Sequence, residues 1–478
     1  MLRYRKYDKI LRGFCFSFIL LASSIVIAEG QARVLYPAAK TTVLCYMNGD
    51  NDLSSEVFHA IDTMETVGSS DQINVIVLAD GHPDWLKTYG REWQRTRLIR
   101  IARDPQLGRI RSPVIDEWQE ADLGDPSTLQ RFVKTAIERF PAEKYIFMMF
   151  AHGRGIINTK QFGSVTPNKR LSISRDATSR SAMSMAQMQN ALTRALNGQQ
   201  FELTVLSSCL SNMVEIGYEL ADVTRYLIAS QDEIHLLDEP PGTFQIRGIK
   251  FDKIIQHLYD DPSIDIRSLC RIIIDDFMAD YRFERHGSQK AAADGSGVFP
   301  ATMAAIDCRQ IASLTTQLDR LAARIIERLE QPAFLKNWQA ILGQTQRFPS
   351  FLNLEYYDLG NLLEITMLET SDAQIRQLCE EILSQLHSRL IVHEEHTAGQ
   401  HASGVSIYVS NPLVPQNIFD VHQSLYGQCK FSQDTRWDEM INRYRHRIDD
   451  LRPDKNSESQ KGDSLLPQPE KRDSRSAR

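Results

Sequence analysis

The chain has 478 residues, of which 42% are hydrophobic and 24% charged, an ordinary composition for a soluble globular protein. This length exceeds one small domain and predicts two units or one large, elaborated one. A formal net charge of -6, with no basic patch interleaved with aromatic residues beyond the extreme N-terminus, excludes a nucleic-acid-binding protein.

Residues 1–28 have the pattern of a secretory signal peptide. Basic residues at positions 3 to 12 precede an apolar run over residues 14–28, which ends in small residues suited to signal peptidase. The alternative is an uncleaved anchor, since the run is only slightly shorter than a membrane span. We therefore expect a secreted or periplasmic protein that contacts a membrane only through an uncleaved leader.

From residue 41 onward, short apolar runs alternate with helical patterns, which is typical of an α/β domain with a mainly parallel sheet. Strands are predicted over residues 41–48, 73–80, 144–151, 202–208 and 226–230, with an edge strand over 97–103. Helices are predicted over residues 54–67, 127–140 and 185–196, the first capped by the turn at 49–52 and the second by Ser127. A polar stretch over residues 158–184 is longer than most loops.

Beyond about residue 250 the pattern becomes mostly helical. Apolar residues recur at steps of three and four over residues 311–329 and 375–386, and one late strand is predicted over 404–410. The last segment, 451–478, is rich in Ser, Lys, Asp and Pro and is predicted to be a disordered tail. Six cysteines lie beyond the leader without a CxxC pair, which excludes a zinc ribbon and a dense disulfide framework.

Two reactive side chains directly follow predicted strands, namely His152 and Cys209. Ligands bind α/β sheets at the carboxyl ends of the strands, so the two side chains would face each other if their strands are neighbours. An imidazolium nearby lowers the pKa of a thiol, and the N-terminus of the helix after Cys209 would favour the thiolate further. The backbone N–H groups of Gly153 and Cys209 are candidates for holding an oxyanion.

Each residue also has a structural interpretation. A cysteine at the end of a buried strand is usually a small apolar filler, and a histidine there is often a surface residue. The histidine precedes the cysteine by 57 positions, close to the interval of about 50 residues in caspase-type enzymes. Their joint placement therefore favours a catalytic pair.

Several segments resemble, in order and spacing, the motifs of the clostripain family of cysteine peptidases. The segments are TVLCYMNGDNDLSSEVFHAIDTMETVGSSDQINVIVLADG, DLGDPSTLQRFV, YIFMMFAHGRG, LSSCLSNMVEIGYEL, LIASQDE with PPG, and GVSIYVSNP. The resemblance covers most of residues 41–250 and parts of the C-terminal half. It implies a caspase-like core over residues 36–250, completed by a mostly helical region over 251–450, and a histidine–cysteine dyad that falls on His152 and Cys209.

Two departures from the family argue against cleavage after arginine or lysine. Clostripain-like enzymes commonly carry an aspartate two residues before the nucleophile, which is thought to receive a basic side chain, and this chain has Ser207 there. A neutral hydroxyl cannot supply the same charge-assisted contact. Asp232 is a candidate substitute in substrate binding, with a solvated loop acid as the alternative. Arg154, after the histidine, replaces a small residue and would crowd the cleft or repel a basic substrate.

Some members of the clostripain family mature by internal cleavage, and some depend on calcium. The resemblance therefore raises both questions for this chain. The stretch at 158–184 contains Lys160, Lys169, Arg170, Arg175 and Arg180 and is either a processing site or a flexible surface loop. Asp50 and Asp52 are the acids that would bind calcium, although turn and helix-cap roles explain them without a metal.

No other metal site or cofactor is expected. The segment HEEHTAGQH at 393–401 lacks the order and spacing of HExxH. The sequence therefore predicts an exported cysteine endopeptidase that acts on peptides or proteins through a thioester. The alternative is an exported, catalytically inactive relative that binds peptides or surface partners.

Overall fold

A nine-stranded sheet forms the centre of the computed structural model. The structure describes residues 36–82, 93, 95–157, 173–234, 248–282, 300–349, 355–397 and 400–451, and the backbone of two short antiparallel strands, β1 (Ile25–Val26) and β2 (Arg33–Val34). The strands of the central sheet, in spatial order, are β15 (Ile391–His396), β12 (Thr302–Asp307), β11 (Thr224–Ala229), β10 (Phe201–Ser207), β7 (Ala142–Phe150), β3 (Ala39–Gly49), β4 (Ile73–Gly81), β5 (Arg97–Arg100) and β6 (Val114–Glu117).

The five central strands run parallel to one another, namely β11, β10, β7, β3 and β4. The outer pairings are antiparallel: β11 with β12, β12 with β15, β4 with β5, and β5 with β6. Parallel strands covered on both faces consist of nearly continuous apolar residues, as in β3. Leu44 and Tyr46 pack into the core on one face of the sheet, and Val43, Cys45 and Met47 pack into the core on the other. The predicted mainly parallel α/β sheet is confirmed.

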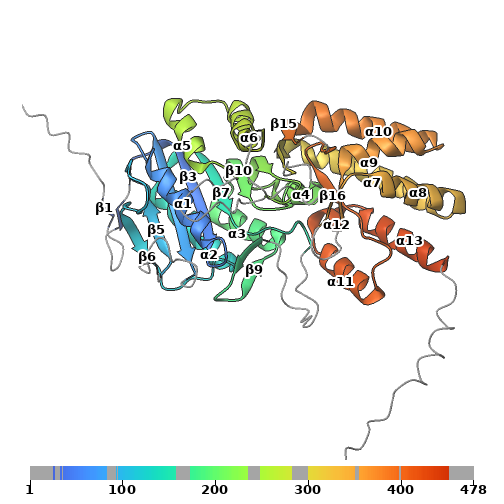
Figure 1. Ribbon diagram of the computed structural model, residues 1–478, viewed down its shortest axis with the longest axis horizontal. Helices are drawn as coiled ribbons and strands as arrows, with labels where there is room; N and C mark the ends of the chain where they lie inside the picture. The colour runs from blue at the N-terminus through green and yellow to red at the C-terminus, as the bar shows by residue number, and fades with distance from the viewer. Residues whose placement is uncertain are drawn as a thin grey trace, which may run out of the picture.

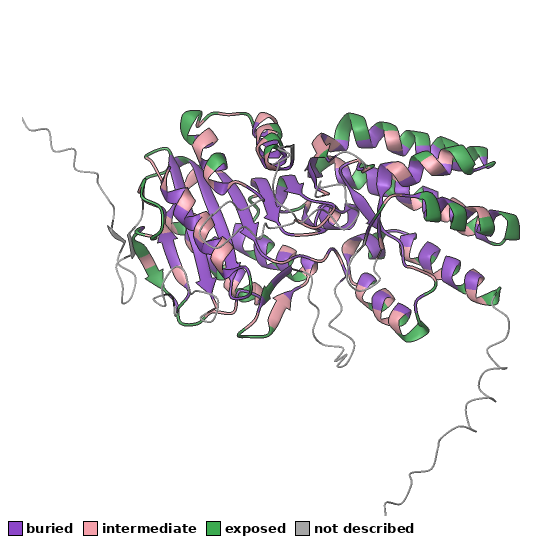
Figure 2. Ribbon diagram, viewed as in Figure 1, coloured by how far each residue is buried: buried purple, intermediate pink, exposed green. Residues whose placement is uncertain are grey.

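Helices cover both faces of the sheet (Figures 1 and 2). One face carries α1 (Ser54–Glu65), α5 (Phe251–Asp260) and α6 (Ile266–Arg282). The other carries α2 (Pro126–Arg139), α3 (Met185–Leu196) and α4 (Val214–Leu220). Helix α7 (Ile311–Leu329) packs against α4 and against the helices of the C-terminal half. Figure 2 shows the central strands buried and the edge strand β6 largely exposed, with other exposed residues gathered on the outer faces of the helices, as amphipathic helices require.

The C-terminal half adds a group of helices and a small sheet at one end of the molecule (Figure 1). The helices are α8 (Pro332–Gln344), α9 (Leu359–Glu369), α10 (Ala373–Gln385), α11 (Gln416–Tyr426), α12 (Lys430–Asp434) and α13 (Trp437–Asp450). The small antiparallel sheet consists of β13 (Arg347–Pro349), β14 (Glu355–Asp358) and β16 (Ser406–Tyr408). A hairpin, β8 (Ile173–Asp176) with β9 (Ser181–Met183), forms a separate two-stranded sheet.

Two strands of the central sheet, β12 and β15, come from the half that the sequence predicted to be mostly helical. A short apolar run such as the one in β12 cannot be told from a buried helix by periodicity alone, and β15 is a polar edge strand. The predicted late strand exists as β16, but it pairs with β14 rather than with the central sheet. These pairings join residues far apart in sequence, so local patterns do not reveal them.

The start of α2 differs from the prediction. Ser127 was expected to cap this helix, but Asp125 occupies the N-cap position, and its carboxylate accepts the N–H of Ser127 at 2.7 Å. Pro126 takes the first helical position, where its missing N–H and fixed φ suit a helix start. Among the described residues, no helix is long and apolar enough to cross a membrane.

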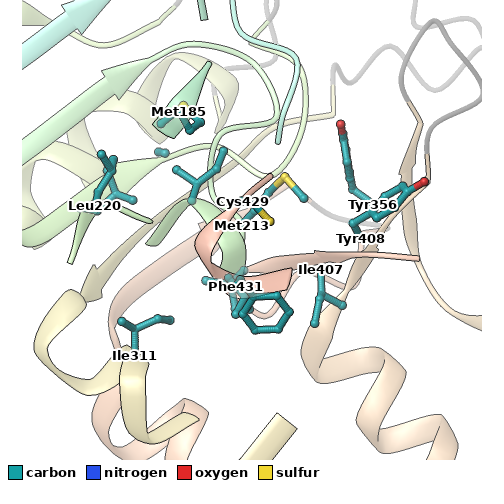
Figure 3. Packing of buried hydrophobic residues seen from close by; sticks show 14 of the residues in the cluster. Met185, Met213, Leu220, Ile311, Tyr356, Ile407, Tyr408, Cys429 and Phe431 are labelled. Carbon is teal, nitrogen blue, oxygen red and sulfur yellow. The ribbon is translucent and has the colours of Figure 1, made fainter. Parts of the chain in front are cut away.

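One core cluster joins the N-terminal and C-terminal halves (Figure 3). It includes Met213 before α4, Ile311 of α7, and Tyr356 and Tyr408 of the small sheet. The core beside the sheet is therefore continuous with the core of the C-terminal helices, and the two halves pack as one body.

Glu215 is a fully buried carboxyl group within this core. Its Oε1 accepts the N–H of Tyr408 at 2.9 Å and the O–H of Tyr426 at 3.0 Å. Burial raises the pKa of Glu215 to about 7. The folded state therefore keeps a proton that the unfolded chain loses near its ordinary pKa of about 4.3, so stability from this group falls as pH rises between these values.

Replacing this carboxyl by a permanently neutral amide, Glu215→Gln, should flatten the pH dependence of stability. We expect the free energy of unfolding of the variant, relative to wild type, to rise by about 2 kcal/mol between pH 5 and pH 8, since one pKa unit corresponds to about 1.4 kcal/mol. Urea unfolding of both proteins at the two pH values measures this. Parallel pH profiles for the two proteins would contradict a raised pKa at Glu215.

Candidate active site

His152 and Cys209 lie at the same edge of the sheet because their strands are neighbours. Strands β7 and β10 run parallel with Phe150 opposite Ser207, so each reactive residue follows its strand by the same interval. The N–H of Ala151 continues the pairing by donating to the carbonyl of Ser207 at 3.3 Å. The predicted condition for the pair, adjacent strands, is met.

Gly153 packs directly against the segment that carries the cysteine. A Cβ added at this glycine would lie 2.6 Å from the carbonyl oxygen of Cys209 and 2.8 Å from Cβ of Ser208. Such distances require backbone to move, because the nearest atom belongs to the main chain. A glycine is therefore needed here for the approach of the two loops, a reason that the sequence did not reveal.

The imidazole of His152 is paired with a carboxylate on its other side. Its Nε2 lies 2.7 Å from Oδ1 of Asp52, which follows β3, the strand next to β7. The His152 side chain is 33% exposed and that of Asp52 is 64% exposed, so the pair lies at the surface of the site. The hydrogen bond with His152 lowers the pKa of Asp52. Asp52 therefore stays ionised at neutral pH.

The thiol of Cys209 is partly accessible and is not preionised. Burial raises the pKa of Cys209 to about 11, with Glu233 and Asp232 adding to the rise, while the N–H of Ile234, 3.3 Å from Sγ, lowers it. Among the described residues, no hydrogen bond joins His152 to Cys209. Attack by the sulfur therefore requires a base that takes the thiol proton.

The expected support from a helix N-terminus is weaker than predicted. Helix α4 begins at Val214, five residues after Cys209, and the intervening chain includes Leu210 with a positive φ of 56°. The dipole of a helix acts mainly within its first turn. It therefore does not offset the raised pKa of Cys209.

Cys209 is also distinguished by its accessibility. The six cysteines in the part of the chain that the structure describes are all free, and five of them are buried. Burial raises the pKa of the five others well above the ordinary value; they are Cys45, Cys270, Cys308, Cys379 and Cys429. Of these six thiols, Cys209 alone is within reach of a substrate.

The two predicted substrate-binding residues differ in their surroundings. Ser207, the last residue of β10, is buried, and its Oγ has no hydrogen-bond partner among the described residues. The Asp232 carboxylate accepts the side-chain amide of Gln400 at 3.0 Å, and its carbonyl accepts the N–H of Leu210 at 3.1 Å. Asp232 is thus tied to the cysteine loop rather than being a solvated loop acid.

Tyr356, which the sequence did not indicate, supports the histidine loop. Its hydroxyl donates to the carbonyls of Arg154 at 2.8 Å and Ile157 at 3.2 Å. Gly155 has a φ of +75°, and a Cβ there would meet the Tyr356 ring at 2.5 Å. The small sheet of the C-terminal half therefore shapes the loop that follows β7. Tyr356 lies about 200 residues from this loop, so no local motif connects them.

The acids suggested for calcium have separate partners. Asp50 accepts the N–H and O–H of Thr178, whereas Asp52 pairs with His152. The predicted helix-cap role of this turn is wrong, since α1 has Leu53 at its N-cap and no side-chain cap bond. A calcium site at Asp50 and Asp52 stays a prediction. Of the stretch suggested for internal cleavage, residues 158–172 lie outside the described residues.

One group elsewhere could hold a metal ion. Its members are Asp275 on α6 with His393 and Glu395 on β15, whose ligand atoms lie within 4.8 Å of one another. They include one histidine of the HEEHTAGQH segment. Strands β11 and β12 separate β15 from β10, so this group lies away from Cys209.

Comparison with known proteins agrees with this architecture. The clostripain of Hathewaya histolytica is 20% identical over 419 residues, which cover 78% of this chain and 75% of that protein. The crystal structure of iotapain, a secreted C11 cysteine protease of Bacteroides thetaiotaomicron, matches with a TM-score of 0.56 at 15% identity over 84% of this chain and 100% of its own. An inactive zymogen C11 protease of Parabacteroides distasonis matches with a TM-score of 0.56 at 16% identity over 84% and 99%.

The structural matches show the shared fold, and the predicted caspase-like class is confirmed. The sequence model of the clostripain family matches residues 45–444, which include both strand ends and most of the C-terminal half. The chain therefore belongs to the clostripain family of cysteine peptidases.

Proposed function

We propose that this protein is an exported endopeptidase that hydrolyses peptide bonds with Cys209 as nucleophile and His152 as acid and base. The observation that carries the proposal is the equal offset of the two residues from Phe150 and Ser207, which face each other on neighbouring parallel strands. The partly accessible thiol of Cys209 among five buried cysteines supports the same assignment.

The reaction proceeds in two halves. His152 takes the thiol proton of Cys209, the sulfur attacks the peptide carbonyl, and His152 then gives the proton to the leaving amine, which yields a thioester. His152 next removes a proton from water, and the hydroxide attacks the thioester carbonyl. The C–S bond then breaks, the acid leaves, and His152 returns the proton to the sulfur of Cys209. The N–H groups of Gly153 and Cys209 stabilise the oxyanion of each half, as donors aimed at developing charge do.

Because the pKa of Cys209 is raised, His152 must act as the base that takes its thiol proton. A thiol with a pKa of about 11 is almost entirely protonated at neutral pH. Proton removal by His152 must then accompany the attack, rather than precede it as a stable ion pair. The proton transfer is therefore productive only when a substrate carbonyl is in place to be attacked by the sulfur.

Export is part of the proposal and rests on the leader at residues 1–28, which lies outside the described residues except for the backbone of Ile25–Val26. A basic segment followed by an apolar run is typical of a secretory signal. Mass spectrometry of the mature protein, with a first residue shortly after position 28, would support export. An intact N-terminus in a membrane fraction would instead support an anchor.

Specificity is proposed to be broader than cleavage after arginine or lysine. Ser207 offers a hydroxyl where the resemblance leads us to expect a carboxylate, and the Asp232 carboxylate is already engaged by Gln400. A basic side chain would therefore meet less negative charge than in relatives with an aspartate at the first position. The expected substrates are peptides or proteins, and no cofactor is required.

The decisive experiment compares wild type, Cys209→Ala and Cys379→Ala on a mixed-sequence peptide library read by mass spectrometry. Cys379 is buried in α10 and is a matched control for loss of a thiol. We expect turnover by wild type and Cys379→Ala and a loss of at least about 1,000-fold for Cys209→Ala, the scale of a lost nucleophile.

Two outcomes would contradict the proposal. Turnover that survives Cys209→Ala would remove this residue as nucleophile. A wild-type protein that cleaves no peptide, both as the intact chain and after limited trypsin treatment, would favour an exported relative that binds peptides without cleaving them. Alkylation supplies an independent check, since iodoacetamide should label Cys209 before the five buried cysteines.

A further inference from the structure

Strand order places His152 between two other functional candidates. Strand β7, which leads to His152, pairs with β10 on one side and with β3 on the other. Cys209 follows β10 and Asp52 follows β3, so the histidine has the thiol loop on one side and a carboxylate on the other. A nucleophile, a base and a third group that orients the base recur in this arrangement in unrelated hydrolases.

We propose that Asp52 is a positioning residue that accepts the Nε2–H of His152 and thereby makes Nδ1 the nitrogen that takes the proton of Cys209. This inference rests on the proposed function and deepens it. A carboxylate accepts but cannot donate a hydrogen bond, so the contact of 2.7 Å requires the proton on Nε2. The neutral ring then carries its lone pair on Nδ1, and the partner of one nitrogen sets the role of the other.

The carboxylate of Asp52 is directed to the histidine rather than to its own helix. Helix α1 follows immediately, yet its N-cap is Leu53, and no side chain caps it. The turn is closed instead by Asn51, whose Oδ1 accepts the N–H of Leu53 at 2.8 Å. Asn51, and not Asp52, therefore supplies the side-chain hydrogen bond that closes this turn.

Buried hydrogen bonds hold the Asp52 loop and the His152 loop to the same strand. Asn51 donates to the carbonyl of Arg175 at 2.8 Å, and Asn48 donates to Oγ of Ser174 at 2.9 Å. The N–H of Ser174 in turn donates to the carbonyl of His152 at 3.1 Å. Strand β8 thus fixes the separation of the two loops, and preorganised partners of this kind are what a catalytic base needs.

The carboxylate would act in two ways during the reaction. It keeps the imidazole in one tautomer before the proton transfer, and it stabilises the imidazolium that forms when Nδ1 takes the thiol proton of Cys209. Because the Asp52 side chain is 64% exposed, water screens part of this charge. The expected contribution is therefore nearer to the 10- to 100-fold effect of an orienting partner than to that of a buried triad aspartate, about 10,000-fold.

The test compares Asp52→Asn with wild type, with Asp71→Asn as the matched control. Asp71 is an exposed acid just before β4, at the opposite ends of the strands from His152. For Asp52→Asn we expect kcat to fall about 10- to 100-fold with KM changed less than about threefold. Asp71→Asn should match wild type in both kcat and KM.

A second readout does not depend on turnover. Nitrogen-15 NMR of the histidine side chains in Cys209→Ala reports which ring nitrogen of His152 carries the proton. The signal that is lost when His152→Ala is added identifies this imidazole. We expect the Nε2–H form with Asp52 present and a mixture of forms with Asp52→Asn. An Nδ1–H form in the presence of Asp52, or an unchanged kcat in Asp52→Asn, would overturn the inference.

The two readouts also separate this inference from the proposed function. A wild type without peptidase activity, but with the Nε2–H tautomer that depends on Asp52, would contradict the function and support the positioning role. An active wild type that needs Cys209 but is indifferent to Asp52→Asn would support the function and refute the positioning role. Thermal unfolding of each variant checks that the fold is retained, as expected for an exposed side chain.

Discussion

Gly153→Ala is expected to abolish most of the peptidase activity and to destabilise the fold. The added methyl would lie 2.6 Å from the carbonyl oxygen of Cys209 and 2.8 Å from Cβ of Ser208, distances that real Cβ atoms do not reach. The loop with the base and the loop with the nucleophile must therefore separate. Because a misplacement of about 1 Å can cost about 100-fold in rate, we expect a loss of at least this size in kcat/KM.

The same substitution should lower the free energy of unfolding by about 1–3 kcal/mol, the usual cost of forcing an extra methyl into a packed site. Gly343→Ala is the control, since a Cβ at this helical glycine meets nothing within 4 Å. It should leave activity unchanged and stabilise the protein by about 0.5–1 kcal/mol, because alanine favours a helix. Peptide hydrolysis and urea unfolding measure both effects. A fully active Gly153→Ala would show that the two loops do not need this close contact.

Ser207→Asp is expected to create a preference for arginine or lysine before the cleaved bond. The change introduces the carboxylate that the resemblance to clostripain-like enzymes leads us to expect, at a buried position two residues before Cys209. A charge-assisted hydrogen bond contributes about 1.5–3 kcal/mol, so the ratio of kcat/KM for basic over neutral residues should rise about 10- to 100-fold. Without substrate the new carboxylate is unpaired, and we expect a loss of about 1–3 kcal/mol in the free energy of unfolding.

Ser207→Asn provides the matched control, because it has the size of the aspartate without its charge. It should leave the ratio for basic over neutral peptides within about threefold of wild type, since a neutral amide gives only an ordinary hydrogen bond. Profiling the residue before the cleaved bond on the same peptide library measures all three proteins. Equal ratios for Ser207→Asp and Ser207→Asn would place residue 207 outside the substrate pocket.

The strands of the central sheet were predictable where burial on both faces makes them continuous apolar runs. Strand β3 is such a run, and so are β4, β7 and β10, each bounded by polar or glycine residues. Strands β12 and β15 were missed because one is short and the other has a polar, partly exposed sequence at the sheet edge. Strand β12 pairs with β11, and β15 pairs with β12, across more than 70 residues of the chain. No local sequence pattern reveals such pairings.

The reactive pair was predictable because both members end such strands, and chemistry at the carboxyl ends of parallel strands is a general property of α/β folds. The contact of Asp52 with His152 was not predictable, since a calcium ligand, a helix cap and a histidine partner share one local pattern. The choice among them depends on β3 and β7 being neighbours. The same holds for Tyr356, whose contact with the histidine loop joins two distant segments.

The amino-acid sequence by itself thus determined the fold class, the family and the positions of His152 and Cys209 directly after two apolar strands, because burial and strand periodicity are local properties. That these strands are neighbours was decided by the tertiary structure. Only the tertiary structure decided what surrounds them. It pairs His152 with Asp52, presses Gly153 against the backbone of Cys209 and ties Asp232 to Gln400. These contacts arise from strand order and loop packing, which join segments that no local pattern connects.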